Sequence, residues 1–155
     1  MKKSELMLEA VVSVRGNEAK RLKVNAITKK KIQYINERKQ PEYLRYSQLV
    51  PVPLSNIILE DLGFERRKVK LAFSERNDYI LVLQNKKDEN EFYTISVQPD
   101  EEICVNGYRT VHIDDNRYSS VGFGYAKDMH ELQSIIQSIT KMCLNTKKIL
   151  ECGKD

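Results

Sequence analysis

Apolar and polar residues alternate with period two over the first part of the chain, and this period predicts half-buried β-strands. Gly16 and Asn17 lie between the first two alternating runs and tolerate the positive φ angles of a tight turn. We therefore expect a β meander over residues 8–35, either as part of a small SH3-like barrel or as one edge of a larger sheet. The alternating apolar positions are Leu8, Ala10, Val12 and Val14, then Leu22, Val24 and Ala26, then Ile32 and Tyr34.

Residues 36–50 break this alternation, because a polar stretch ends at Pro41 and the apolar residues after it follow no clear period. We expect a connector that lays apolar side chains over the core. Proline disfavours helical conformation in the residue before it, so a short helix begins only after Pro53. Ser55 is a favourable N-cap for this helix, and Gly63 stands where a left-handed C-terminal cap belongs.

A second strand-rich region covers residues 67–125 and predicts an antiparallel sheet of five or six strands. Asn106-Gly107 carries the strongest hairpin signal, because both residues accept the positive φ angles of a type I′ turn. Polar loops are expected at residues 86–90 and 114–116. The predicted strands are residues 69–73, 79–83, 92–97, 103–105, 108–113 and 118–125, the last of them weakened by Gly122 and Gly124.

The clearest element is a helix near the C-terminus. Asp128 and Glu131 have the spacing of a capping box, and polar residues such as Gln133 lie off the apolar stripe. This helix is expected to pack across the sheet, and the lysine-rich tail over residues 145–155 is expected to fray. The apolar stripe consists of Leu132, Ile135, Ile136, Ile139, Met142 and Cys143.

These elements predict an α+β fold with one core and one domain over residues 1–155. Its parts are a basic β meander and connector over residues 1–49, then a short helix, an antiparallel sheet and a C-terminal helix over residues 50–144. The frayed tail follows over residues 145–155.

The charge of the chain is unevenly distributed. Residues 1–40 hold 11 basic and 4 acidic side chains, a net charge of +7, whereas the other 115 residues hold 15 basic and 18 acidic, a net charge of −3. Such an asymmetry is typical of a surface for nucleic acid or an acidic partner. The competing interpretation is a solvated strand face on which lysines discourage edge-to-edge pairing.

Two candidate binding sets follow from this charge. Nucleic-acid binding requires clustered cations, and the nearby Tyr34 could offer a stacking surface, although it lies on the apolar face of its strand. The candidate cations are Lys20, Arg21, Lys23, Lys29, Lys30 and Lys31, with a second cluster at Arg66, Arg67 and Lys68. A small-ligand pocket would instead use Arg45, Tyr46, Arg109 and Tyr118.

No pattern of titratable residues predicts catalysis. His130-Glu131 begins like a zinc-protease motif, but Ser134 stands where the second histidine is required. His112 is the only other histidine, and His130 is expected to be a half-exposed residue in the first helical turn. The acidic clusters at residues 100–102 and 114–115 lack calcium-loop spacing. We therefore expect a protein that is not an enzyme and holds no metal or cofactor.

The compartment is constrained by what the sequence lacks. No window approaches the roughly 18 apolar residues of a membrane span, and no apolar secretory segment follows Met1. An odd, unpatterned set of three cysteines suits a reducing cytoplasm better than a disulfide framework. Cys104 and Cys143 are expected as small core residues, and Cys152 lies in the tail.

Three segments resemble a group of small uncharacterised proteins that are frequent in Bacteroidota phages, prophages and other mobile elements. Residues 50–64 are similar to the group's PIPLTEEIL…GF segment, residues 129–140 to its VHELQNLYFALTG segment, and residues 24–28 to its V-x-A-I-T strand. There are departures: residues 55–57 replace Thr-Glu-Glu, the group's opening LRIGN is absent, and residues 36–50 have no counterpart.

The resemblance implies a bacterial or phage setting and an accessory role, and it carries over no catalytic residue. We therefore predict a non-enzymatic binding or interaction protein in the cytoplasm of a bacterial host, with a protein partner. The alternatives are a nucleic-acid-binding module that uses the N-terminal basic patch, and a nucleotide-binding protein with an anti-defence role. A monomer and a dimer both remain open.

Overall fold

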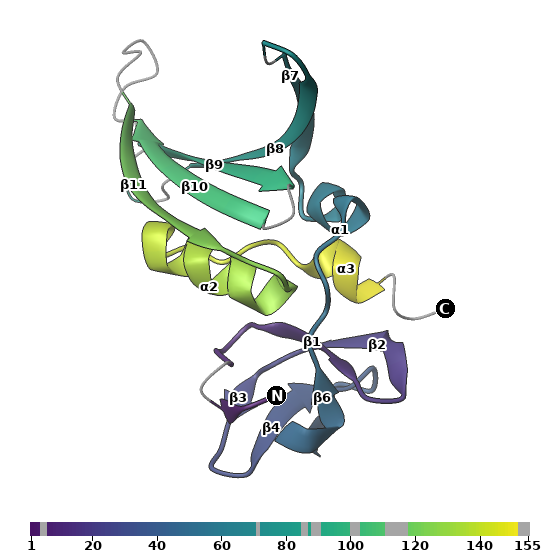
Figure 1. Ribbon diagram of the computed structural model, residues 1–155. Coiled ribbons are helices and arrows are strands. Elements are labelled where there is room, and N and C mark those ends of the chain that lie inside the picture. The colour runs from purple at the N-terminus through teal and green to yellow at the C-terminus, as the bar shows by residue number, and fades with distance from the viewer. Residues whose placement is uncertain are drawn as a thin grey trace.

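The computed structural model describes residues 1–3, 6–70, 72–84, 87, 91–99, 103–110 and 118–151. Strands in three antiparallel sheets make up most of it, and helices cover one face of the largest sheet, so the α+β prediction is confirmed (Figure 1). None of the helices in these residues is long and apolar enough to cross a membrane.

Two three-stranded sheets make up the N-terminal part. The first has the order β2 (Asn17–Lys23), β1 (Val11–Val14) and β6 (Leu49–Val50). The second has the order β3 (Ala26–Ile27), β4 (Lys31–Ile35) and β5 (Pro41–Arg45), followed by the 3-10 helix η2 (Tyr46–Gln48). The strands assigned in the described residues do not close into a barrel.

The predicted alternation in β1 is only partly correct. Leu8 is more than half exposed, whereas Val11 and Val12 are both fully buried. Both faces of β1 are covered, because Val11 belongs to the larger of two buried apolar clusters and Val12 to the smaller one. A strand that is covered on both faces loses the period-two signal. The buried residues of the smaller cluster are Ala10, Val12, Leu22, Val24, Ile32, Tyr34 and Leu49.

The predicted connector over residues 36–50 is wrong for most of its length. Strand β5 pairs with β4 from Pro41↔Ile35 to Arg45↔Lys31, and β6 pairs back with β1. Pro41 is the first residue of a sheet-edge strand, a position where a missing N–H is tolerated. Because most of the β5 side chains are exposed, the sequence shows no alternation there.

The five-stranded sheet has the order β11 (Tyr118–Tyr125), β10 (Ile103–Thr110), β9 (Phe92–Pro99), β8 (Glu75–Gln84) and β7 (Glu65–Lys70). The predicted turn at Asn106-Gly107 is wrong, since both residues lie inside β10 and pair with Ser96 and Ile95 of β9. Pairing with a strand on each side outweighs the local turn preference. The predicted loops at residues 86–90 and 114–116 lie outside the described residues, apart from Lys87.

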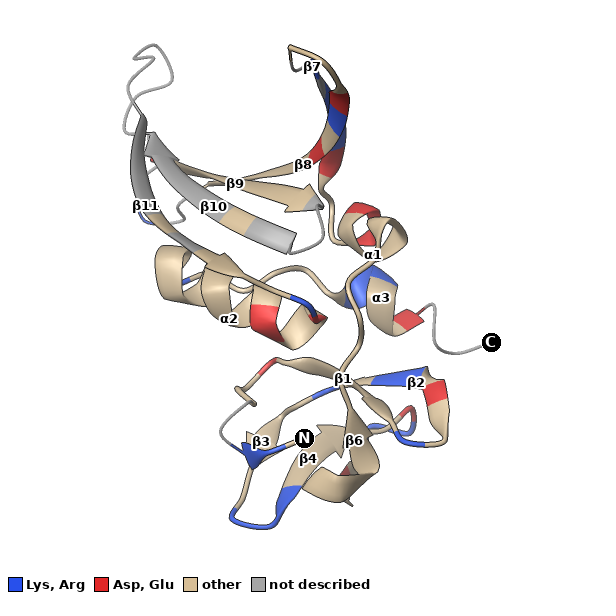
Figure 2. Cartoon of the chain, in the orientation of Figure 1, with Lys and Arg blue, Asp and Glu red and all other residues tan. Residues whose placement is uncertain are grey.

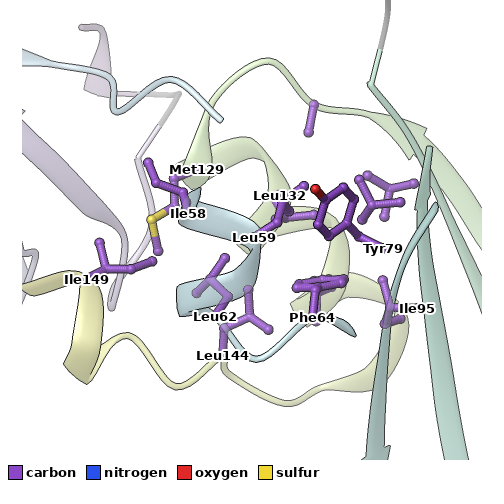
Figure 3. Packing of buried hydrophobic residues seen from close by; sticks show 14 of the residues in the cluster. Ile58, Leu59, Leu62, Phe64, Tyr79, Ile95, Met129, Leu132, Leu144 and Ile149 are labelled. Atoms are coloured by element: carbon purple, nitrogen blue, oxygen red, sulfur yellow. The ribbon is translucent and has the colours of Figure 1, made fainter. Parts of the chain in front are cut away.

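Helices α1 (Asn56–Asp61), α2 (Met129–Thr140) and α3 (Lys147–Glu151) gather around the larger cluster (Figure 3). The predicted caps are confirmed. Ser55 Oγ accepts the Ile58 N–H at 3.3 Å, and Gly63 has a φ of 94°. Glu131 Oε2 accepts the Asp128 N–H at 3.3 Å as part of a capping box.

The glycines in β11 let α2 approach the sheet closely. A Cβ atom added to Gly124 would lie 2.9 Å from Ile135 Cδ1, and one added to Gly122 would lie 3.1 Å from Ile139 Cγ1. Residues that weaken the strand signal in the sequence are therefore sites of helix–sheet contact.

Three predictions about the C-terminal region are wrong. His130 is buried rather than half exposed, Gln133 is buried although it lies off the apolar stripe, and Cys143 is exposed rather than part of the core. Residues 147–151 form α3, and Ile149 within it is fully buried, so this part of the tail does not fray. Residues 152–155, including Cys152, lie outside the described residues.

Hydrogen bonds to backbone groups join the N-terminal sheets to α2. Gln133 of α2 accepts the Val11 N–H at 2.9 Å and donates to the Glu9 carbonyl at 2.9 Å. The Met129 N–H donates to the Val52 carbonyl at 2.8 Å, which holds the start of α2 against the segment before α1. The prediction of a single domain stays open, because the buried apolar residues form two clusters.

Candidate functional site

A groove of about 510 Å³ opens between β2, the end of β4 and the turn that connects β4 to β5. Strand β2 supplies Lys20, Arg21 and Lys23, and the turn supplies Arg38. Leu150 of α3 closes one side. The groove therefore unites three of the predicted nucleic-acid-binding cations with a fourth one, Arg38, that the sequence analysis did not select.

The cations of the groove differ in how strongly they are already paired. Lys23 Nζ lies 2.9 Å from the Glu9 carboxylate, and Arg21 Nη1 donates to the Ile149 carbonyl at 3.5 Å. Lys20 Nζ lies 5.5 Å from the centre of the Tyr34 ring. The exposed Arg38 has no ion-pair or hydrogen-bond partner among the residues that the structure describes. Lys20 Nζ also donates to the uncharged Tyr34 hydroxyl at 3.5 Å. Arg38 is therefore the cation most available to an anion, and Lys20 is exposed without an acidic partner at hydrogen-bond distance among the described residues.

A hydrogen-bonded network lines the wall of the groove. The Tyr34 hydroxyl donates to Glu42 Oε2, and Asn36 Nδ2 donates to Glu42 Oε1 at 2.8 Å. Tyr34 itself is buried, which confirms its predicted place in the core. Both oxygens of Glu42 accept a hydrogen bond from an uncharged donor, so the carboxylate keeps its negative charge and offsets part of the groove's positive charge.

The network perturbs the ionisation of both its members. Burial, the hydrogen bond to Glu42 and the charge of Glu42 together raise the pKa of Tyr34 to about 12. The hydrogen bonds from Tyr34 and Asn36 lower the pKa of Glu42, with smaller contributions from the charges of Lys20 and Arg38. At neutral pH the wall therefore holds a neutral phenol and a carboxylate.

We expect Tyr34 to ionise with a pKa of about 12 in the folded protein, above its ordinary value of 10.0. The stability that this shift contributes is fully present below pH 10.0 and is lost as the pH rises through about 12. Phenolate absorbance of the wild type minus that of Tyr34→Phe isolates this titration. In Glu42→Gln the pKa should fall toward 10.0 but stay above it, since burial is the largest cause. An unchanged pKa in that variant would contradict the network.

Lys29, Lys30 and Lys31 lie outside the groove, at the opposite end of β4. Lys29 and Lys30 are exposed in the turn before β4, and Lys31 pairs in register with Arg45. The Tyr46 hydroxyl donates to the Thr28 carbonyl and so ties η2 to this turn. The structure thus brings these three lysines together with Arg45 and Tyr46, which the sequence assigned to a different site.

Arg66, Arg67 and Lys68 form part of edge strand β7, at the far end of the molecule from the groove (Figure 2). The two predicted basic clusters therefore do not merge into one patch. Their separation follows from the chain path, because β7 belongs to the five-stranded sheet and β2 to the N-terminal part.

The four residues predicted for a small ligand are distributed over two sheets. Arg45 and Tyr46 lie in β5 and η2, whereas Arg109 and Tyr118 lie in β10 and β11 of the five-stranded sheet. Arg109 and Tyr118 lie close to each other in the sheet, because Tyr118 pairs with Thr110, the residue after Arg109. The structure does not bring all four residues into one place.

Asp128, His130 and Glu131 place potential metal-ligand atoms within 4.8 Å of one another at the start of α2. Glu131 Oε2 is already engaged there, because it accepts the N–H groups of Lys127 and Asp128. Burial raises the pKa of Asp128, and the nearby Glu131 charge adds to this rise. A helix N-terminus carries partial positive charge, which disfavours a cation. We interpret Asp128 and Glu131 as a helix capping box, beside which His130 is buried in the first turn.

Arg38, Asn36, Glu37 and Glu42 are polar groove residues that sequence reasoning missed. They stand in a stretch predicted to be a connector, and no local pattern there indicates a site. The available signal was the cluster of polar residues before Pro41, which is typical of a turn. A turn at that place would have joined two strands and brought Arg38 beside β2.

The fold and the groove define an α+β protein whose smaller, N-terminal part carries a cationic groove. Comparisons of the chain with protein-family models, with curated proteins and with solved structures find no match.

Proposed function

We propose that the protein is a non-enzymatic binding protein and that its groove binds nucleic acid through the phosphate groups. The observation that carries this proposal is the convergence of Lys20, Arg21, Lys23 and Arg38 on one concave surface. Two carboxylates, Glu37 and Glu42, line the same groove, so its cations are in excess. Clustered cations supply most of the affinity for nucleic acid by displacing counterions from the phosphates.

The geometry favours contacts to phosphates over contacts to bases. Tyr34 is the only aromatic residue among the described residues that line the groove, and it is buried with Lys20 over its ring. A base therefore has no free aromatic face on which to stack in the groove. Binding there should depend strongly on salt and weakly on base sequence, because phosphate contacts carry no sequence information.

We expect the double charge reversal Lys20→Glu/Arg38→Glu to weaken binding of a labelled oligothymidylate by roughly tenfold or more at low salt. Both side chains are exposed, so the fold should be retained. Fluorescence anisotropy over a series of salt concentrations measures the affinity and its salt dependence together. The slope of log K against log salt should become shallower in the variant.

The matched control is Lys29→Glu/Lys30→Glu, which makes the same change of charge on exposed residues outside the groove. We expect a much smaller effect from it. Equal losses in the two variants would assign binding to the overall charge rather than the groove. A wild-type protein that does not bind the oligonucleotide would leave a protein partner as the better interpretation.

A free nucleotide is a second candidate ligand, and the size of the groove favours it. Small-molecule pockets enclose roughly 300–1,000 Å³, and the groove volume of about 510 Å³ lies within that range. Calorimetry with mononucleotides distinguishes the two ligands. A nucleotide site saturates with a mononucleotide, whereas a site for a strand gains affinity as the oligonucleotide lengthens.

The setting that the sequence resemblance implies is a cytoplasmic accessory role in a bacterial phage or mobile element. A nucleic-acid-binding protein fits that setting, and so does a protein that binds a nucleotide signal. The two N-terminal sheets share one buried cluster, and on this basis we propose that this part of the chain is SH3-like. Superposition of an experimental structure on SH3-like barrels tests it.

A further inference from the structure

The hairpin of β7 and β8 extends beyond the rest of the five-stranded sheet as a two-stranded arm. Strand β8 pairs with β9 only from Tyr79 to Gln84, whereas its pairing with β7 continues to Glu75. Residues 67–70 and 75–78 are therefore paired only with each other among the described strands. Figure 1 shows this arm rising from the sheet, away from the helices.

One face of the arm carries a row of cations. Side chains alternate along a strand, so Arg66, Lys68 and Lys70 share one face at intervals of about 6.8 Å. The register sets Arg66 opposite Tyr79 and Lys68 opposite Asn77, neither of which is acidic, whereas Lys70 stands opposite Glu75. All three basic side chains are exposed. This spacing is comparable to that of successive phosphates along one nucleic-acid strand.

Phe73 lies in the turn at the tip of the arm and is fully exposed, with a relative accessibility of 102%. Its neighbours Ala72 and Ser74 are also exposed, so no described side chain of the turn shields the ring. Exposing a phenylalanine forfeits about 1.5–3 kcal/mol of burial free energy. A free aromatic face beside a row of cations is the combination that binds unpaired bases and their phosphates.

We propose that the arm is a second contact for nucleic acid, in which Phe73 stacks on an unpaired base and Arg66 and Lys68 bind neighbouring phosphates. The ligand class is single-stranded nucleic acid, because stacking on Phe73 requires a base face that a continuous duplex does not offer. This inference rests on the proposed function for the class of ligand. Its residues are separate, since the arm and the groove lie at opposite ends of the molecule (Figure 2).

Charge and apolar area favour nucleic acid over an anionic membrane as the occupant. Phe73 is the only large apolar side chain of the described arm residues that is exposed, and one ring gives little penetration into lipid. Glu65 and Glu75 are also exposed at the two ends of the ribbon, where an anionic membrane would repel them. Glu75 stands opposite Lys70 near the tip, so a strand bound to Phe73 reaches Lys68 and Arg66 past one opposed pair of charges.

The test measures binding of a labelled oligothymidylate by the full chain with substitutions at Phe73. Stacking on one base contributes enough for Phe73→Ala to weaken binding by roughly tenfold. Phe73→Tyr should bind as the wild type does, because it keeps the aromatic ring. Phe73→Leu should bind as weakly as the alanine variant, although it keeps the apolar character.

The variant Arg66→Ala/Lys68→Ala provides an independent test through the salt dependence of oligonucleotide binding. Loss of two phosphate contacts to a single strand should reduce the slope of log K against log salt by about 1.4. The control Lys29→Ala/Lys30→Ala makes an equal change of charge at the exposed turn before β4. It should leave the slope close to that of the wild type.

The outcomes separate this inference from the proposed function. Weaker oligonucleotide binding by Phe73→Ala and Phe73→Leu, together with full binding by Lys20→Glu/Arg38→Glu, would support the arm and overturn the groove. Loss only in the groove variant would overturn the arm. Full binding by Phe73→Leu would also overturn it, since stacking would then play no part. Retention on phosphatidylserine vesicles, without oligonucleotide binding, would overturn it in favour of a membrane contact.

Discussion

Ile149→Ala is expected to lower the free energy of unfolding by about 2–5 kcal/mol, the range for truncating a fully buried isoleucine. The same substitution at Ile57 should change it by less than about 0.5 kcal/mol, as is usual at the surface. The two residues differ in environment rather than in chemistry. Ile149 has a relative accessibility of 0%, whereas that of Ile57 is 71%.

The size of this effect follows from how α3 is held. A helix of only five residues is not stable by itself, so tertiary packing must hold it in place. Ile149 packs into the larger apolar cluster with Met129 and Ile58, and Leu144 lies between α2 and α3 (Figure 3). Removing the Ile149 side chain leaves a cavity in that cluster and weakens the attachment of α3.

Urea denaturation of the two variants measures the difference. A secondary effect is expected at the groove, because Arg21 donates to the Ile149 carbonyl and Leu150 lines the groove wall. Equal stability losses in the two variants would show that α3 is not docked in solution. A loss confined to Ile149→Ala would support the docked helix.

Gln133→Ala is expected to cost about 2–4 kcal/mol, because it leaves two backbone groups without their partner. The Val11 N–H and the Glu9 carbonyl both bond to the Gln133 amide. The bond to Val11 is buried, so water does not replace the lost acceptor without rearrangement. Glu9 has a φ of 68°, an unfavourable angle for a residue other than glycine, and the bond to Gln133 helps to hold it.

Gln137→Ala is the matched control, since it removes the same side chain one helical turn later. No side-chain hydrogen bond involves Gln137 among the described residues. Denaturation should show a change below about 0.5 kcal/mol for this variant. Hydrogen exchange at the Val11 amide should accelerate only in Gln133→Ala. Unchanged protection of that amide would show that Gln133 does not join α2 to β1.

Local signals in the sequence were sufficient for both ends of α1, for the start of α2 and for most strands, whereas the apolar stripe continued past Thr140, where α2 ends. Ser55, Gly63 and the Asp128–Glu131 pair act on backbone groups within four residues, so their effect does not depend on the rest of the fold. The buried alternation of Ile32 and Tyr34 is equally local. These elements appear in the structure where their patterns predict them.

The elements that were predicted wrongly are those whose conformation depends on distant partners. Asn106-Gly107 has a strong turn preference, yet pairing with β9 keeps it extended within β10. Gln133 lies off the apolar stripe of its helix, yet it is buried, because the backbone of Glu9 and Val11 forms hydrogen bonds with its side chain. Burial of Ile149 likewise requires α1 and β2, which no pattern near the tail reveals.

In the candidate site, too, some residues could be selected from the sequence alone, whereas others are placed only by the tertiary structure. Composition and charge were enough to select Lys20, Arg21 and Lys23, because a cluster of cations is visible in the chain itself. Only the pairing of β4 with β5 brings Arg38 and Glu42 to the same groove, and only sheet membership separates Arg66 to Lys68 from it. Capping and alternation act over a few residues, whereas a groove is formed by segments that meet only when the sheets assemble.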